Sequence, residues 1–431
     1  MNLAYLSLGA LLLIIVVSCF TEINVGVMAI ALAWIVGVVI GGMKVDQLIA
    51  GFPVSLFLTL TGVALFFTQA QVNGTLDRIA HHAVRLCRGN AGLIPVMFFV
   101  VAAALATIGP GNIATAALLA PVAMSVASQA RIPAFLMAIM VGNGANAGAL
   151  SPLAPTGIIA ANLMARIGMA GVEWTTYRNN LLAHAVVAFG GYFLLGGWKL
   201  FRVDNSQLGP MQIGPIQSGG ADAFVCARPP GPAAVKFERA HWITIALVAL
   251  LVVSVVVFKV NVGMGAFACG VILCALQAAD HKESIRRMPW GVILMVCGVT
   301  VLIALLEKTS GMDLFTAMLA KFSTRHTVTA VVAFVTGLFS VYASTSGVVL
   351  PAFLPTVPGL VERLGGADAM AIASSINVGG HLVDVSPLST IGALCLAAAP
   401  ASEDCRMLFN KLLAWGLSMS IVGAVVCYLM F

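Results

Sequence analysis

Apolar segments of about 17–25 residues recur along nearly the whole chain, and they limit its possible folds more than any other feature. A helix of that length spans the hydrocarbon core of a bilayer. Only 9% of the residues are charged, whereas a soluble domain carries roughly a quarter. The segments lack the ~10-residue alternating pattern of an outer-membrane barrel. The sequence therefore predicts an all-α polytopic membrane protein.

The basic residues indicate membrane topology rather than a nucleic-acid partner, because they lie mainly in short loops between apolar segments. Placing both termini outside puts most of the 22 Lys and Arg residues on the cytoplasmic side. We therefore expect a bacterial-type inner (plasma) membrane protein with its N- and C-termini outside. The first apolar segment, 3–20, lacks a basic start and an Ala-x-Ala site, so it is expected to be a retained span.

The order of segments in the first half of the chain recurs in the second half. The tripeptide Ser-Pro-Leu begins at Ser151 and again at Ser386, a shift of 235 residues. In register with the other segments, this recurrence indicates an internal duplication. We expect a first repeat over 1–201, a cytoplasmic linker over 202–240 and a second repeat over 241–431. The expected spans lie at 3–20, 23–42, 54–72, 180–201, 241–259, 262–279, 290–308 and 405–430, with arms at 73–90 and 309–325.

Each half also contains two apolar segments that Gly, Pro, Ser or Thr residues interrupt. We expect re-entrant hairpins over 91–130 and 327–363, and broken helices over 133–169 and 367–400. If each hairpin leaves on the side from which it entered, each repeat crosses the membrane five times. Five is odd, so the second repeat is expected to be inverted relative to the first.

Interruptions at equivalent places in two inverted halves indicate the binding site of a transporter near the membrane midplane. Unwound backbone is tolerated at that depth only where protein or a water-filled cavity satisfies it. Each break creates a helix N-terminus, which favours an anion, and a C-terminus whose carbonyls can bind a cation such as sodium. The residues expected to cap the four new N-termini are Asn112, Thr156, Ser346 and Ser389 or Thr390.

Charged side chains are almost absent from these interrupted segments. Stretches 91–130, 132–165 and 327–361 contain no Asp, Glu, Lys or Arg, and 369–402 contains only His381 and Asp384 as ionisable groups. A dianion would find no Arg there, so co-bound sodium ions would balance its charge. The sequence therefore favours cation symport.

His381 and Asp384 lie three residues apart on one helical face, and an ionisable residue within the membrane indicates function. Asp384 is expected to bind the ion, although the two side chains could instead pair to fix the unwound segment. Asn143, Asn146 and Asn377 either bind a ligand or join helices. His184, near a span end, is expected to be structural.

The two inverted repeats, each with a hairpin and a helix broken at Ser-Pro, resemble the divalent-anion:sodium symporters of the ion transporter superfamily. The stretch Ser-Pro-Leu-Ala-Pro-Thr from Ser151 to Thr156 is similar to the malonate/dicarboxylate carrier branch. The resemblance implies a homodimer in which hairpins and broken helices move against a scaffold by an elevator motion.

In that family each hairpin tip carries Ser-Asn-Thr, whose side chains contact both sodium and a carboxylate. Here the first tip reads Gly111-Asn112-Ile113, with Thr115 two positions on, so Asn112 is implied as a shared ligand. The second tip, Ser344-Thr345-Ser346, lacks the Asn and departs from the family at the second sodium site. The family's Thr-Pro corresponds to Ser151-Pro152 and Ser386-Pro387.

Two sets of site residues are therefore expected. The substrate is expected to contact Asn112, Thr115, Ser151, Pro152, Thr156, Ser346, Asn377, Ser386, Pro387, Ser389 and Thr390. Sodium is expected to contact Gly109, Gly111, Asn112, Asn146, Leu150, Ser344, Thr345, Asp384 and Val385.

The leading hypothesis is a secondary active transporter, not an enzyme, that imports a small malonate-like dicarboxylate (a C3 or C4 dianion) by sodium symport. No cofactor is expected apart from sodium as the coupling ion. The main alternative is a proton-coupled organic-anion transporter that uses His381 and Asp384. An intramembrane serine protease, with Ser346 as nucleophile and His381 as base, is a remote alternative. A passive channel is a third hypothesis, and the mirrored broken helices argue against it. An arsenite exporter and the large subunit of a binding-protein-dependent system remain open.

Overall fold

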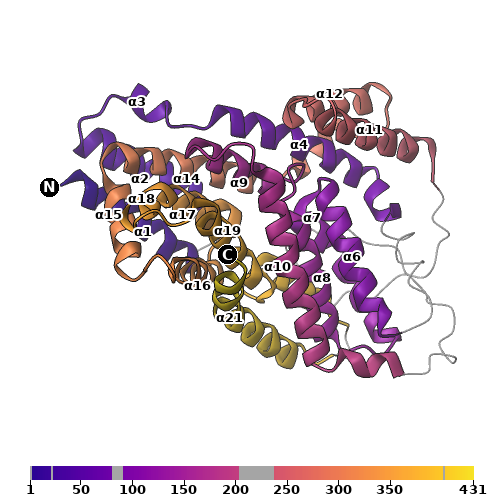
Figure 1. Ribbon diagram of the computed structural model, residues 1–431. Helices are drawn as coiled ribbons and strands as arrows, with labels where there is room; N and C mark the ends of the chain where they lie inside the picture. Colours follow the sequence, from indigo (N-terminus) through magenta and orange to yellow (C-terminus); the bar gives the residue numbers. More distant parts are fainter. Residues whose placement is uncertain (1, 21–22, 80–90, 203–236, 401–402) are drawn as a thin grey trace.

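The computed structural model describes residues 2–20, 23–79, 91–202, 237–400 and 403–431, and every regular element in these residues is a helix (Figure 1). The expected linker lies outside the described residues over 203–236, as does the expected first arm over 80–90. The expectation of an all-helical membrane protein with several spans is confirmed by the helices and their apolar surface.

The first half of the chain follows the expected order of segments. Its elements are α1 (Leu3–Phe20), α2 (Val25–Trp34), η1 (Ile35–Ile40), α3 (Val45–Ile49), α4 (Val54–Val72), α6 (Leu93–Ile108), α7 (Gly111–Gln129), α8 (Ala134–Ala149), α9 (Pro155–Arg166), α10 (Glu173–Leu194) and η2 (Gly197–Arg202).

The second half repeats this order, with the second hairpin helix divided into short pieces. Its elements are α11 (Arg239–Val256), α12 (Val262–Ala275), α13 (His281–Arg287), α14 (Trp290–Lys308), α15 (Gly311–Lys321), α16 (Val328–Ser340), η3 (Thr345–Val349), α17 (Leu350–Phe353), η4 (Leu354–Thr356), α18 (Val357–Arg363), α19 (Ala369–Leu382), η5 (Val383–Val385), α20 (Thr390–Ala397) and α21 (Cys405–Met430).

One span boundary was predicted wrongly. The span expected at 180–201 is α10, which begins at Glu173 and ends at Leu194. Hydropathy marks only the apolar part of this helix, whereas its first turns contain polar residues such as Thr176, which is buried. Glu173 in the first turn also favours an earlier start, because an acidic group there interacts well with the helix dipole.

The first hairpin turns at a glycine that no other residue could replace without strain. Helices α6 and α7 meet at Gly109, whose φ is +148°. A Cβ at this position would lie 2.1 Å from ring atoms of Phe67 in α4. The tip is therefore held against α4, and both backbone conformation and space require glycine there.

The two broken helices have matching turns at their Ser-Pro-Leu sequences. Between α8 and α9, the Leu153 N–H donates to Ser151 Oγ over 3.3 Å, and the Ala154 N–H donates to the Ser151 carbonyl. Between η5 and α20, the Leu388 N–H donates to Ser386 Oγ over 3.4 Å, and the Ser389 N–H donates to the Ser386 carbonyl. In each turn the serine satisfies backbone groups that the break has freed.

Helices from the two halves cross at glycines in equivalent places. A Cβ at Gly26 of α2 would lie 2.2 Å from the Leu294 carbonyl oxygen of α14. A Cβ at Gly263 of α12 would lie 2.4 Å from Thr59 Cα of α4. The two halves therefore contact each other at two crossings. Helix α2 of the first half packs on α14 of the second, and α4 of the first half packs on α12 of the second.

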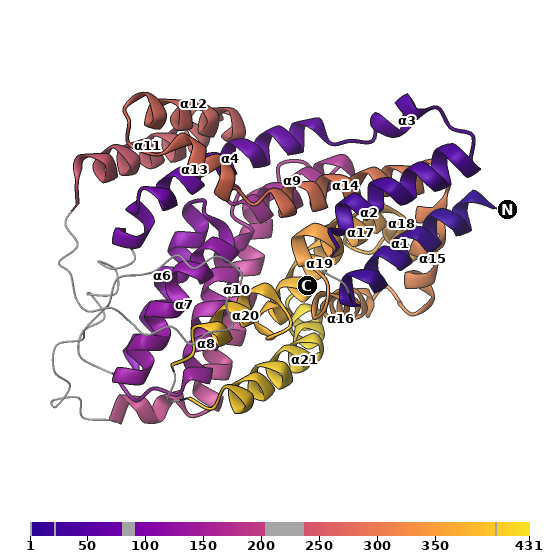
Figure 2. The same ribbon diagram turned by 180° about the vertical axis from the view of Figure 1, so that it is seen from behind.

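The apolar core has two main parts. One part joins α1, α2, α4, α12, α14 and α15 to the second limb of the second hairpin. The other joins α6, α7, α8, α10, α20 and α21. In both ribbon views α1, α2 and α15 of the first part lie at the end of the molecule that carries the N-terminus, and α6 and α8 of the other part lie at the opposite end (Figures 1 and 2). The second hairpin and α19 contribute residues to both parts.

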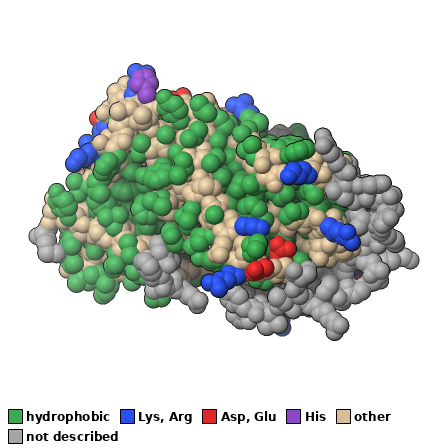
Figure 3. Space-filling view, turned by 90° about the horizontal axis from the view of Figure 1, so that it is seen from below, with side chains coloured by type: hydrophobic (Ala, Val, Ile, Leu, Met, Phe, Trp, Pro, Cys, Tyr) green, Lys and Arg blue, Asp and Glu red, His purple; other side chains and the backbone are tan. Residues whose placement is uncertain are grey.

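The outer surface is suited to lipid. Figure 3 shows a face on which hydrophobic side chains cover most of the area and charged groups are few. Large apolar residues such as Leu194, Phe258 and Phe322 are strongly exposed. Among the described residues, five helices have the length and apolar composition to cross a membrane, and shorter apolar helices accompany them. The chain is a multi-pass membrane protein.

Candidate functional site

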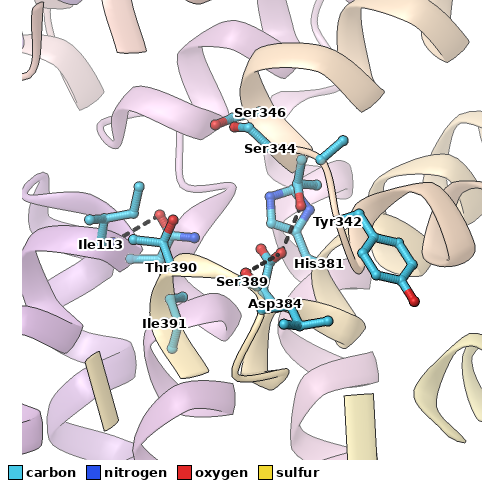
Figure 4. A pocket seen from close by; sticks show the side chains of 13 residues that line it. Ile113, Tyr342, Ser344, Ser346, His381, Asp384, Ser389, Thr390 and Ile391 are labelled. Carbon is cyan, nitrogen blue, oxygen red and sulfur yellow. Dashed lines mark hydrogen bonds between the residues drawn. The ribbon is translucent and has the colours of Figure 1, made fainter. Parts of the chain in front are cut away.

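A cavity of about 130 Å³ lies where the second hairpin tip, the second break and the start of α7 meet (Figure 4). This volume has room for several water molecules or a small solute. Its wall consists of Asn112, Ile113, Tyr342, Ala343, Ser344, Thr345, Ser346, His381, Asp384, Leu388, Ser389, Thr390 and Ile391. The wall contains one carboxylate and neither Lys nor Arg.

Asp384 joins the second hairpin tip to the second break. Thr345 Oγ1 donates to Asp384 Oδ1 over 2.8 Å, and Ser389 Oγ donates to the same oxygen over 3.2 Å (Figure 4). Thr345 also forms a short hydrogen bond with Ser340 at the end of α16. Asp384 is 7% exposed, so this carboxylate is nearly buried and hydroxyl groups solvate it in place of water.

Asn112 is the main contribution of the first half of the chain to the cavity. Its Nδ2 donates to Asn146 Oδ1 over 2.9 Å, and its Oδ1 accepts from the Ile113 N–H over 3.0 Å. Asn146 in turn donates to the His381 carbonyl oxygen over 3.2 Å. The first hairpin tip is therefore linked through α8 to the helix that carries His381.

Three helix starts border the cavity, rather than the expected four. These are the starts of α7, η3 and α20, whose first residues line the wall. None of the residues of α9 lines the wall, and Pro155 at its start packs against the first tip, where a Cβ at Gly111 would be 3.1 Å from Pro155 Cδ. The positive ends of three helices can therefore interact with an anion in the cavity.

The expected capping roles were mostly wrong. Asn112 and Thr156 lie inside the first turns of α7 and α9, where Pro110 and Ala154 hold the cap positions. At the second tip the cap is Ser344, not Ser346, because Ser344 Oγ accepts from the Gly347 N–H over 3.2 Å. Ser389 holds the cap position of α20, but its hydroxyl bonds to Asp384 instead.

The structure brings together seven of the residues expected from the sequence. They are Asn112, Ser344, Thr345, Ser346, Asp384, Ser389 and Thr390. The remaining expected residues do not line this cavity: Gly109, Gly111, Thr115, Asn146, Leu150, Ser151, Pro152, Thr156, Asn377, Val385, Ser386 and Pro387. Ser151, for example, donates through Oγ to the Thr107 carbonyl over 2.7 Å and so fixes the first break to the first hairpin.

The wall also contains residues that the sequence-based lists omitted. They are Ile113, Tyr342, Ala343, Leu388 and Ile391, together with His381, which was considered for proton coupling, for catalysis or for pairing with Asp384. Each apolar member is a close sequence neighbour of an expected residue at a tip or break. That proximity is the one signal that could have identified them, since apolar residues fill the surrounding segments.

The geometry gives no support to a serine–histidine pair. His381 Nδ1 lies 2.7 Å from the Asn377 carbonyl oxygen, and Asp384 is bonded to Thr345 and Ser389. Among these described residues, no hydrogen bond joins Ser346 to His381 or His381 to Asp384. The alternative in which His381 and Asp384 pair with each other is therefore wrong for this structure.

Comparisons with known proteins agree with a transporter. Residues 1–149 match the family model described as "Dicarboxylate carrier protein MatC N-terminus". The comparison with curated protein sequences returned no match.

Two solved transporters share the fold at low sequence identity. The YdaH transporter of Alcanivorax borkumensis, whose topology is described as unusual, is 14% identical, with a TM-score of 0.56 over 90% of this chain and 89% of that one. MtrF of Neisseria gonorrhoeae, assigned to a class of antimetabolite efflux pumps, is also 14% identical, with a TM-score of 0.55 over 92% of this chain and 84% of that one. The matched family and both structures are transporters, not enzymes.

Proposed function

We propose that the chain is a secondary active transporter that imports a small dicarboxylate, a malonate-like C3 or C4 dianion, by sodium symport. The observation that carries the proposal is the cavity wall, which combines three helix starts and several hydroxyl groups with one carboxylate and no basic side chain. The description of the family that matches residues 1–149 supports the dicarboxylate class.

The wall suits a carboxylate in its polarity but not in its charge. Ser344, Ser346 and Thr390 offer hydroxyl groups, and the starts of α7 and α20 contribute positive dipole ends. These groups can orient a dianion without neutralising it, and an uncompensated charge at membrane depth is costly. A co-transported cation supplies the missing charge.

Sodium is the cation that the oxygen atoms around Asp384 favour. A carboxylate, the Thr345 and Ser389 hydroxyls and the Gly380 carbonyl, which lies 3.3 Å from Thr345 Oγ1, form a group of oxygen ligands. Hard monovalent cations prefer such ligands. Proton coupling through Asp384 and His381 is the second candidate, because Asp384 has no basic partner in the wall.

The proposed architecture is two inverted repeats, 1–201 and 241–431, each with five spans, a re-entrant hairpin and a broken helix. The matching Ser-Pro-Leu turns and the exchanged glycine crossings of α2 with α14 and α12 with α4 support it. We further propose termini outside, a cytoplasmic linker, a homodimer and an elevator motion.

Counterflow in proteoliposomes tests the substrate class without assuming a coupling ion. Vesicles loaded with unlabelled malonate should take up labelled malonate or succinate in sodium buffer. Loading with acetate or citrate should not support this exchange. Exchange that is equally fast with acetate inside, or absent with every dicarboxylate, would refute the proposal.

A further inference from the structure

A polar cluster is buried between α8, α10 and α19, and only His381 among its members also lines the cavity. Every one of these side chains is 0% exposed. The cluster consists of Asn143 and Asn146 of α8, Asn180 and His184 of α10, and Asn377 and His381 of α19. Six buried polar side chains at one three-helix contact, within apolar surroundings, require an explanation.

Hydrogen bonds fix the tautomer of His184. Asn143 Nδ2 donates to the Ile139 carbonyl over 2.9 Å, which leaves Asn143 Oδ1 facing His184 Nδ1 at 3.0 Å. An amide oxygen only accepts, so Nδ1 of His184 carries the hydrogen. In the neutral imidazole Nε2 then carries the lone pair, and this atom is buried without a hydrogen-bond partner.

The same reasoning applies to His381 and to two amides. His381 Nδ1 donates to the Asn377 carbonyl over 2.7 Å, so its buried, unpartnered Nε2 is also a lone pair. Asn377 Nδ2 donates to the Ala373 carbonyl over 2.9 Å, and Asn180 Nδ2 donates to the Asn146 carbonyl over 2.8 Å. The Oδ1 atoms of Asn377 and Asn180 are buried without a donor.

These four atoms, which we term the acceptor cluster, come from two helices that are in contact, α10 and α19. Asn180 and His184 are one turn apart on α10, and Asn377 and His381 are one turn apart on α19, a rise of about 5.4 Å. Asn146 joins both turns, since its carbonyl accepts from Asn180 and its Nδ2 donates to the His381 carbonyl.

All four atoms of the acceptor cluster accept, and none donates. A buried polar atom without a partner is destabilising, so four such acceptors on two contacting helices indicate a ligand with positive charge or donor hydrogens. We propose that the acceptor cluster binds one monovalent cation, either an alkali ion held by the lone pairs or an ammonium ion that donates to them. Asp384, three residues after His381, adds favourable negative charge.

This site differs from the ion position proposed around Asp384 and the hairpin tips, because Asn180 and His184 belong to α10. A cation bound there would offset the charge of a dianion in the adjacent cavity. That role in coupling rests on the proposed function, whereas the binding itself does not.

Thermal unfolding of the purified protein, without substrate, tests the binding. Melting temperatures are compared in choline chloride and in sodium, potassium, lithium or ammonium chloride at constant ionic strength. One of these cations should raise the melting temperature in a saturable way. Asn377→Asp adds a negative charge to the site and should lower the half-saturating concentration about tenfold.

Two variants that each remove one proposed ligand, and one control variant, show where the cation binds. Asn180→Leu and His184→Phe should abolish the saturable shift, each measured against its own choline baseline. Gln69→Met should keep it, because Gln69 also has a buried, unpartnered amide oxygen but lies between α4 and α12.

The variant Asn112→Ala distinguishes cation binding at the acceptor cluster from cation binding at the hairpin tip. A shift that survives Asn112→Ala and disappears in Asn180→Leu supports the acceptor cluster. A shift that disappears only in Asn112→Ala places the ion at the tip and overturns the inference while leaving the proposed function intact. A protein that responds to none of the cations would also overturn it, with buried water as the partner of the four acceptors.

Discussion

Asp384 is held at the cavity by side chains from two different elements. Thr345 of the second hairpin and Ser389 of the second break donate to one of its oxygens. A hydrogen bond to a charged group contributes about 1.5–3 kcal/mol. The position of this carboxylate therefore depends on the hairpin tip staying in place beside the break.

Thr345→Val removes one of these donors while it keeps the shape of the side chain. We expect the half-saturating sodium concentration for malonate uptake to rise about tenfold, since the lost bond is worth more than 1.4 kcal/mol. Thr336→Val is the matched control, because Thr336 is equally buried in the same hairpin but bonds only to the α16 carbonyls of Val332 and Ala333. An equal effect of both substitutions would show that Thr345 acts through hairpin stability alone.

For individual residues, the sequence predicted the polar residues of the cavity wall better than the apolar ones. Ser344, Thr345 and Asp384 stand out because they interrupt apolar segments, and all three line the cavity. Tyr342 could not be identified as a wall residue from the sequence. An aromatic residue in an apolar segment can pack against protein, lipid or a ligand, and the sequence pattern is the same in all three cases. Asn180 was missed because the buried position of a polar residue depends on which helix covers it.

Among the elements, the first hairpin depends most on a single residue. Gly109 has a positive φ, and Phe67 occupies the space that a side chain would need. Any change there moves the hairpin tip away from α4, and Asn112 moves with it.

Gly109→Ala should therefore destabilise the protein by about 1–3 kcal/mol and weaken substrate binding as well. The measurement is the melting temperature in detergent, followed by uptake at several malonate concentrations. Gly190→Ala in α10 is the control, because a Cβ there meets nothing within 4 Å. A helical Gly-to-Ala change at such a position should be neutral or slightly stabilising. Equal melting temperatures for the two variants would contradict this account of the tip.

The existence and order of the elements could be predicted, but some of their ends could not. The breaks at Ser151 and Ser386 follow from the proline after each serine, which is a local effect. The caps were assigned wrongly because a local pattern permits several starts, and tertiary contacts select among them. Ser389 shows this, since its hydroxyl bonds to Asp384 instead of capping α20.

For the whole molecule, the exchanged crossings of α2 with α14 and of α12 with α4 are the feature that joins the two halves. Gly26→Ala and Gly263→Ala should each lower the melting temperature by a similar amount, because each added Cβ would contact the backbone of the opposing helix. Gly9→Ala in α1 is the control, with nothing within 4 Å of the added atom. A loss of stability at only one of the two crossings would contradict the equivalence of the repeats.

The two halves of the chain do not contribute equally to the cavity. Its wall comes almost entirely from the second half of the chain, while the first half supplies Asn112 and Ile113. Matching patterns in the two halves led us to predict repeats, but the choice of one hairpin as the principal wall depends on how the cores pack. No local pattern contains that information.

The most direct test of sodium-coupled dicarboxylate import is the accumulation of labelled malonate in proteoliposomes with an imposed gradient. An inward sodium gradient should concentrate malonate above its external level, and a sodium ionophore should abolish this accumulation. Asp384→Asn should retain counterflow but lose the sodium-driven accumulation. Accumulation under a proton gradient alone, or the same uptake with and without sodium, would contradict the account.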